Sequence, residues 1–185
     1  MEVLSTQLDS INKLQTVTQS NITLPKKLNP DTVTLLNQRL EDEYVAHYFY
    51  TNAANWCTDK GYKKAATFFN SEALSELEHA KILQDFMVSW NVVPFLPPVK
   101  IVPAFNNLID IISKAYEMEY KLLVNYTNDS LEIFTVDLIT FDFLQQFRQF
   151  QNKSVIEYSD LLNAAQLIDV SNKFEVLYFE NTYFS

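Results

Sequence analysis

The chain has 185 residues, of which 48% are apolar, 14% aromatic and 20% charged. This is enough apolar sequence for one well-cored domain and too little length for two ordinary ones. One glycine against six prolines leaves almost no residue for the positive-φ corners of hairpins, which argues against an all-β sandwich or barrel and favours helices. The net charge of −9 repels nucleic-acid phosphates and anionic lipid headgroups and attracts cations, so we expect no nucleic-acid or membrane partner.

Cysteine content and targeting signals indicate the compartment. Cys57 is the only cysteine, so neither an intrachain disulfide nor a thiolate zinc cage can form. The amino-terminal residues lack a basic segment followed by an apolar core, and the longest mostly apolar stretch, 92–105, contains four prolines. These features predict an untargeted protein of a reducing compartment, the cytoplasm.

The first long helix has a clear start signal. Residues 1–28 place a few apolar side chains at helical spacing among polar ones, which is typical of a short amphipathic extension, so we expect the main domain to span 29–185. Asn29 is suited to the N-cap and Pro30 to the first helical position. The apolar stripe that follows predicts a helix to about residue 57.

Three more long helices are predicted along the chain. The second follows a Gly-containing turn at 59–61 and ends near residue 91, the third runs from about 106 to a polar turn at 127–130, and the fourth spans about 135–169. A short aromatic segment at 174–184 closes the chain as a fifth helix. The prolines between the second and third helices require a long, non-helical connection. This pattern predicts an all-α four-helix bundle whose middle connection crosses the full bundle length.

Three glutamates interrupt stripes that should be apolar. They are Glu43, Glu76 and Glu119, each on a different predicted helix. A lone buried carboxylate is energetically costly, so three on facing helices indicate a bound cation. His79 follows Glu76 by three residues and therefore shares its helical face. Carboxylates with one imidazole and no sulfur suit a divalent ion such as iron, manganese or zinc.

Each of these residues also has a simpler interpretation. A single Glu-x-x-His pair in a helix is most often exposed to solvent, and only its combination with two further inward glutamates favours a metal site. His47, four residues after Glu43, is either an accessory ligand or an ordinary surface or subunit-contact histidine, and the second interpretation is favoured. Tyr50 either donates a hydrogen bond or an electron near the metal or simply packs in the core.

The segments around these residues resemble a non-haem ferritin. They read Leu40-Glu-Asp-Glu43-Tyr-Val-Ala-His-Tyr-Phe-Tyr50, Glu76-Leu-Glu-His79, Tyr116-Glu-Met-Glu119 and Phe141-Asp-Phe-Leu-Gln-Gln-Phe, followed by Gln151. The resemblance covers about residues 31–180 and implies the ferritin-like fold, for which the Glu and Glu-x-x-His constellation is known.

The resemblance also assigns roles to the residues. It implies that Glu43, Glu76 and His79 hold a first iron. It further implies that Glu76 bridges to a second iron, which Glu119 completes. Gln151 would hold water or oxygen beside the second iron, and Tyr50 would be the tyrosine that the family places nearby.

Departures from the family pattern refine these expectations. Related di-iron oxidases carry a second Glu-x-x-His where this chain reads Gln151-Asn-Lys-Ser154, which implies a weakly held, exchangeable second iron. Leu77 stands where haem-binding relatives have a methionine, so no haem is expected. The third iron site of many bacterial ferritins is expected to be absent, because its matching positions hold no carboxylate: Ser75, Phe150, Lys153 and Ser154.

The resemblance therefore implies an iron-storage ferritin subunit with ferroxidase activity. Fe(II) would bind as a pair, be oxidised by O₂ and be deposited as Fe(III) mineral inside a homo-oligomeric cage of twenty-four subunits, with Asp137 and Asp142 as candidate pore residues. Two other classes stay open. The register at Gln151 and Ser154 argues against a di-iron oxidase or peroxidase. The four retained inward ligands argue against a structural subunit that co-assembles with other chains.

Overall fold

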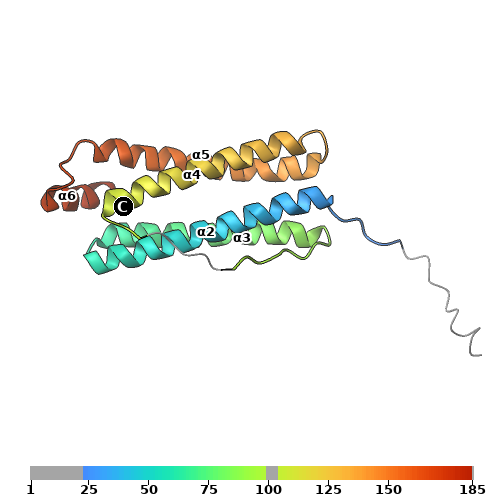
Figure 1. The fold of residues 1–185 in the computed structure, drawn as a ribbon, viewed down its shortest axis with the longest axis horizontal. Coiled ribbons are helices and arrows are strands. Elements are labelled where there is room, and N and C mark those ends of the chain that lie inside the picture. Colours follow the sequence, from blue (N-terminus) through green and yellow to red (C-terminus); the bar gives the residue numbers. More distant parts are fainter. Residues whose placement is uncertain (1–22, 99–103, 185) are drawn as a thin grey trace, which may run out of the picture.

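The bundle consists of two antiparallel helix pairs (Figure 1). The computed structural model describes residues 23–98 and 104–184, and these residues contain five helices and no strand. The helices are α2 (Pro30–Lys60), α3 (Lys63–Ser89), α4 (Leu108–Ile133), α5 (Leu138–Ala165) and α6 (Lys173–Tyr183). The chain leaves α3 at one end of the bundle and starts α4 at the other, while α2 pairs with α3 and α4 with α5. The predicted all-α bundle with a long crossover and a short fifth helix is confirmed.

Local sequence explains both ends of α2. The Asn29 side chain accepts a hydrogen bond from the backbone N–H of Asp31 at 2.9 Å, and Pro30 occupies the first turn, as predicted. At the other end Gly61 has φ +84°, a left-handed conformation that side-chain-bearing residues adopt at a cost. This turn lets α3 begin at Lys63, two residues later.

The predicted end of the third long helix was wrong. The polar residues 127–130 do not form a turn, because α4 continues to Ile133. The hydroxyls of Thr127 and Ser130 donate to backbone carbonyls four residues earlier. These side chains therefore make their hydrogen bonds within the helix and do not end it. Asp129 lies 3.2 Å from Arg39 of α2, which gives this polar segment an inward partner.

The fourth long helix is shorter than predicted at both ends. It begins at Leu138, where the Asp137 carboxylate accepts hydrogen bonds from the backbone N–H of Thr140 at 3.1 Å and from its hydroxyl at 2.6 Å. The helix ends at Ala165. Asp137 is therefore engaged as an N-cap, a role that the sequence analysis did not assign to it.

The extension predicted for residues 1–28 falls largely outside the described residues. Residues 23–29 are described and contain no helix. The domain boundary at residue 29 stays a prediction. Within 23–98 and 104–184, no helix combines the length and apolarity that crossing a bilayer requires.

The bundle interior has two apolar clusters with a polar layer between them. The cluster near α6 includes the buried side chains of Phe49, Ala53, Phe69, Ile112 and Tyr158. The cluster toward the opposite end includes Leu36, Leu40, Leu83, Leu144 and Phe147. Four buried polar residues of α2, α3 and α5 fall between the two clusters along their helices: Glu43, Glu76, His79 and Gln151. The apolar clusters keep water out and fix the positions from which these polar side chains project.

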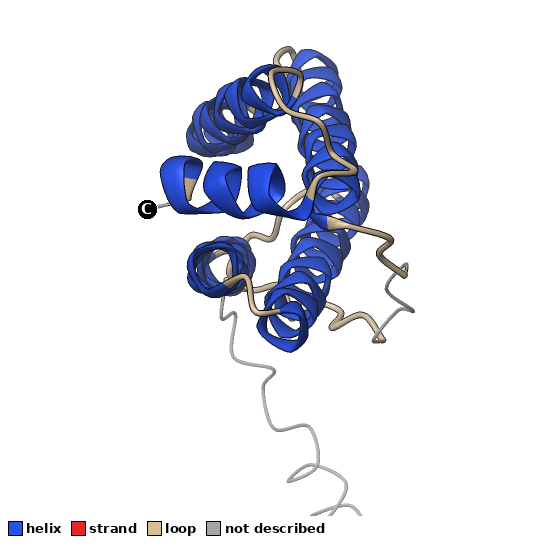
Figure 2. Ribbon diagram, turned by 90° about the vertical axis from the view of Figure 1, so that its left-hand side faces the viewer, coloured by secondary structure: helices blue, strands red, loops and turns tan. Residues whose placement is uncertain are grey.

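Helix α6 lies across one end of the bundle (Figure 2). Its Glu180 is only 2% exposed, and Glu180 Oε1 accepts hydrogen bonds from the backbone N–H groups of Lys64 at 2.6 Å and Ala65 at 3.0 Å. Helix α3 has no side-chain cap from Tyr62, the residue that precedes it. A carboxylate from the far end of the chain therefore satisfies the amino-terminal N–H groups of α3 and complements its dipole.

We expect Glu180→Ala to lower the free energy of unfolding by about 1–3 kcal/mol, because two N–H groups at the start of α3, one of them buried, lose a charged acceptor. Glu180→Gln keeps an acceptor oxygen and should lose less. Urea unfolding at fixed protein concentration measures both, with Glu117→Ala, an exposed glutamate of α4, as the matched control. If Glu180→Ala is as stable as Glu117→Ala, the cap contributes nothing.

Candidate metal centre

Three of the predicted ligands meet in the polar layer. Glu43 on α2 and Glu76 and His79 on α3 each offer one ligand atom, and these atoms all lie within 4.8 Å of one another. His79 Nδ1 is 3.0 Å from Glu76 Oε2 and 3.4 Å from Glu43 Oε2. All three side chains are buried. The one-turn spacing of Glu76 and His79 places both on the face that looks at α2.

Glu119 and Gln151 lie buried on the other helix pair. Glu119 of α4 stands outside the group of three, and its Oε1 accepts a hydrogen bond from the Tyr50 hydroxyl. Glu119 Oε2 and both amide atoms of Gln151 have no hydrogen-bond partner. A buried polar atom without a partner costs about 1–3 kcal/mol, so these atoms fit a site completed by a cation and its ligands.

A tyrosine that the sequence analysis did not single out also contacts the site. The Tyr126 hydroxyl donates to Glu43 Oε1, and Glu43 Oε2 has no hydrogen-bond partner. Tyr126 is fully buried on α4. A sequence signal for this role existed, because Tyr126 follows Glu119 by seven residues, as Tyr50 follows Glu43.

The electrostatics of the site favour a bound positive charge. Burial, followed by the charges of Glu43 and Glu119, raises the pKa of Glu76 well above its ordinary value. Burial raises the pKa of Glu119 to about 8, against the hydrogen bond from Tyr50. Burial also acts to raise the pKa of Glu43, but contacts with His79 and Glu76 outweigh it and hold that pKa low. Without a cation, protons on Glu76 and Glu119 balance the negative charge.

His47 and Tyr50 have distinct places. His47 Nδ1 lies 2.6 Å from the carbonyl oxygen of Ala73 on α3, away from the group of three, which supports its interpretation as an ordinary histidine. Tyr50 is fully buried, and its ring stacks at 6.0 Å on that of Tyr158. Its hydroxyl reaches Glu119, so Tyr50 both packs in the core and contacts a candidate ligand.

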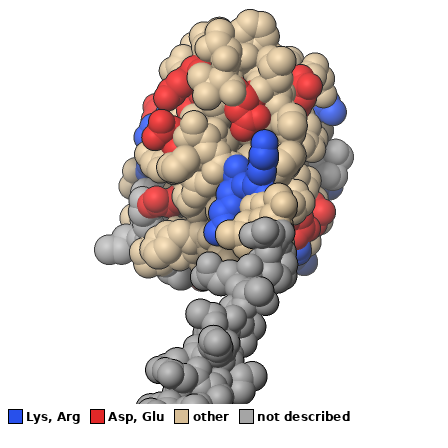
Figure 3. All heavy atoms as spheres, turned by 90° about the vertical axis from the view of Figure 1, so that its right-hand side faces the viewer, with Lys and Arg blue, Asp and Glu red and all other residues tan. Residues whose placement is uncertain are grey.

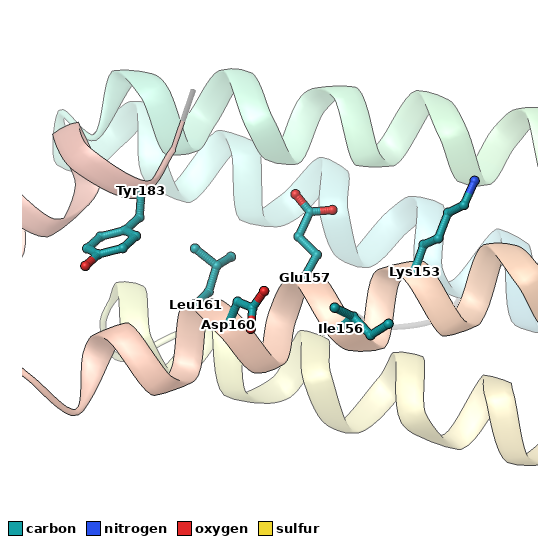
Figure 4. A pocket seen from close by; sticks show the side chains of 6 residues that line it. All are labelled: Lys153, Ile156, Glu157, Asp160, Leu161 and Tyr183. Carbon is teal, nitrogen blue, oxygen red and sulfur yellow. The ribbon is translucent and has the colours of Figure 1, made fainter.

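At the positions matched to a third iron site, the side chains have other neighbours. The Phe150 ring stacks on the His79 ring at 4.6 Å, and the Ser154 hydroxyl lies 3.4 Å from the Phe150 carbonyl oxygen. Lys153 lines a surface pocket of about 420 Å³ on α5, together with Glu157, Asp160 and Tyr183 (Figure 4). A lysine on this face opposes cation binding there. The absence of a third site stays a prediction.

Charge is mixed at the end of the bundle opposite α6. Acidic side chains are scattered around this face, and basic side chains form a band among them (Figure 3). Helix α5 begins at this end, near the candidate pore residues Asp137 and Asp142. Asp137 is engaged as a cap and Asp142 is exposed. Their role in a pore stays a prediction.

The fold and the site together define a helical bundle with carboxylates and one histidine gathered in its core, an arrangement typical of ferritin-like metal proteins. Residues 33–168 match the ferritin-like domain. The chain therefore belongs to the ferritin family.

Relatives and solved structures agree with this assignment. The chain is 27% identical to a bacterial non-heme ferritin of Campylobacter jejuni over 144 residues, which cover 76% of this chain and 86% of the relative. It is 24% identical to a bacterial non-heme ferritin of Escherichia coli O157:H7 over 155 residues, 82% of this chain and 92% of the relative. An engineered closed form of the Archaeoglobus fulgidus ferritin superposes with a TM-score of 0.79 at 19% identity, covering 85% of this chain and 96% of that one. This last likeness concerns the fold alone.

The raised pKa values predict that the metal-free protein loses stability as the pH rises. The folded state holds a proton on Glu119 up to about pH 8, whereas the carboxyl of the unfolded chain titrates near 4.5. The stabilisation is therefore complete below pH 4.5 and is lost as the pH rises toward 8, with a slope of up to about 1.4 kcal/mol per pH unit for each such carboxyl. Glu76 shifts in the same direction and adds to the effect.

Glu119→Gln should flatten this dependence, because the amide does not titrate. Thermal unfolding in the presence of a chelator between pH 5 and 8.5 measures it, and Glu117→Gln is the control. Identical pH profiles for wild type and Glu119→Gln would contradict the assigned charge balance.

Proposed function

We propose that this protein is an iron-storage ferritin subunit with ferroxidase activity. The observation that carries the proposal is the convergence of Glu43, Glu76 and His79 in a buried layer, beside Glu119 with an unpartnered oxygen. Membership of the ferritin family and relatives named as non-heme ferritins support the same conclusion. Ferrous iron and O₂ are the substrates, and no haem takes part.

The residues divide into two iron positions. Glu43, Glu76 and His79 bind the first ferrous ion, and Glu76, which has two oxygens, also reaches the second ion held by Glu119. Iron binding displaces the protons that Glu76 and Glu119 hold in its absence. Two hard cations placed side by side each give one electron to O₂, which takes up two protons and leaves as hydrogen peroxide. The three carboxylates then favour the more highly charged ferric product.

The second position is built to release iron. Gln151 supplies a neutral amide near Glu119, and Ser154 supplies no charge, so the second iron has fewer anionic ligands than the first. A weakly held ferric ion moves on to the mineral more readily than a permanent cofactor does. This difference favours storage over a di-iron oxidase, which needs a stable centre.

Storage requires a closed assembly, which we propose to be a homo-oligomeric cage of twenty-four subunits. Exposed apolar side chains lie at the α4–α5 turn and on α6, where subunit contacts would cover them: Phe134, Val136, Leu138, Ile139, Phe174 and Tyr178. The cytoplasmic location stays a prediction.

Two measurements test the proposal, each made with and without Fe(II) and air. They are light scattering after size-exclusion chromatography and quantification of the bound iron. A shell that gains far more iron than two ions per subunit supports storage. A small oligomer that binds two irons and no more would favour the oxidase class. A large shell that takes up no iron would favour a structural subunit.

Glu76→Ala should slow aerobic Fe(II) oxidation by about a hundredfold or more, because both iron positions lose their shared ligand. The shell should still assemble, since Glu76 is buried inside the bundle. Stopped-flow absorbance after mixing with Fe(II) measures the rate, and Glu117→Ala is the control. An unchanged fast phase in Glu76→Ala rules out this site.

Glu119→Ala should leave one ion bound tightly and prevent pairing, because only the second position loses its main ligand. Anomalous scattering from metal-soaked crystals counts the ions directly. Two fully occupied ions in Glu119→Ala, at the occupancy seen in Glu117→Ala, would refute the division between the two positions.

A further inference from the structure

Tyr126 places a buried hydroxyl at the site, and the proposed oxidation gives this hydroxyl no role. Its side chain is fully buried, and the hydroxyl donates to Glu43 Oε1 across the interface between α4 and α2. The second oxygen of that carboxylate, Oε2, has no hydrogen-bond partner and faces His79 Nδ1 at 3.4 Å. One oxygen of Glu43 is thus occupied by the tyrosine, and the other is left free toward the cluster.

The ring of Tyr126 is held by two neighbours. It stacks on Phe147 of α5 with ring centroids 5.1 Å apart, and the Arg39 guanidinium carbon lies 5.9 Å from its centroid. Arg39 is itself 3.2 Å from Asp42 and 3.2 Å from Asp129. An aromatic stack and a fixed cation leave the ring little freedom, so its hydroxyl has a defined position.

The pair of Tyr126 and Glu43 is reciprocal to the pair of Tyr50 and Glu119. A tyrosine of α4 holds a glutamate of α2, and a tyrosine of α2 holds a glutamate of α4. Each helix carries its tyrosine seven residues after its glutamate, which is two turns or about 10 Å along the axis. Because α2 and α4 run in opposite directions, one alignment brings both pairs together.

We propose that Tyr126 is a positioning residue that presets Glu43 to bind the first cation through Oε2 alone. The hydrogen bond prevents the carboxylate from rotating and from offering both oxygens to one ion. Tyr50 acts in the same way on Glu119. The carboxylates of Glu43 and Glu119 are therefore both oriented before a cation binds. The inference rests on the proposed function only in taking Glu43 as a cation ligand.

Calorimetric titration with Zn²⁺ tests the inference without oxidation chemistry. Tyr126→Phe removes one oxygen and keeps the ring, and we expect it to bind the first Zn²⁺ about tenfold more weakly, as is typical when the partner of a metal ligand is lost. The control is Tyr44→Phe, which removes a tyrosine hydroxyl next in sequence to Glu43 that contacts Gln84 and none of the proposed ligands. It should bind as wild type does.

A double-mutant cycle separates positioning from general loss of structure. In a Glu43→Ala background, Tyr126→Phe should have no further effect on Zn²⁺ affinity, because the carboxylate that it positions is gone. An equal loss in both backgrounds would mean a structural role, and wild-type affinity in Tyr126→Phe would likewise overturn the inference while leaving the proposed function intact. Failure of the wild-type protein to bind Zn²⁺ would instead overturn the metal site itself.

Discussion

The structure depends on the burial of several carboxylates in the core of one helical bundle. Glu43, Glu76 and Glu119 lie where apolar side chains would stabilise the fold more, and each must be compensated. The chain compensates them locally, with an imidazole, two tyrosine hydroxyls and protons that the raised pKa values retain. In the proposed function a cation replaces those protons, so the arrangement that stabilises the metal-free bundle also suits the layer between the apolar clusters to metal ions.

The two iron positions that we propose differ because the four helices supply different donors. Helices α2 and α3 bring together two carboxylates and an imidazole, whereas α4 and α5 bring one carboxylate and an amide. The difference is a matter of charge, which sets how firmly a hard cation is held. Gln151, whose amide atoms have no hydrogen-bond partner, lies on the side with fewer charged donors. The proposed function uses this asymmetry, in that the first position keeps its ion and the second passes its ion on.

Side-chain periodicity predicted the helices and the polar layer, because a 3.6-residue repeat reports which face is inside. Glu76 and His79 were found because both their spacing and their interruption of an apolar stripe are local features. The role of Tyr126 was missed, since its partner is on another helix and the register between helices depends on packing across the core. The end of α4 was missed for a related reason. Polar residues at 127–130 look like a turn until hydroxyl-to-carbonyl bonds and Arg39 are seen to satisfy them.

Because α2 and α4 are antiparallel, the two tyrosine–glutamate pairs respond together when one helix slides along the other. A slide of one helix along the other moves both hydroxyls away from their carboxylates together, so such a slide cannot break one pair and leave the other intact. The two hydrogen bonds therefore depend on the same axial alignment of α2 and α4. Thermal sliding of the two helices would break both at the same moment. A cation bound by carboxylates of both helices would resist that motion, because it would hold α2 and α4 at one axial position.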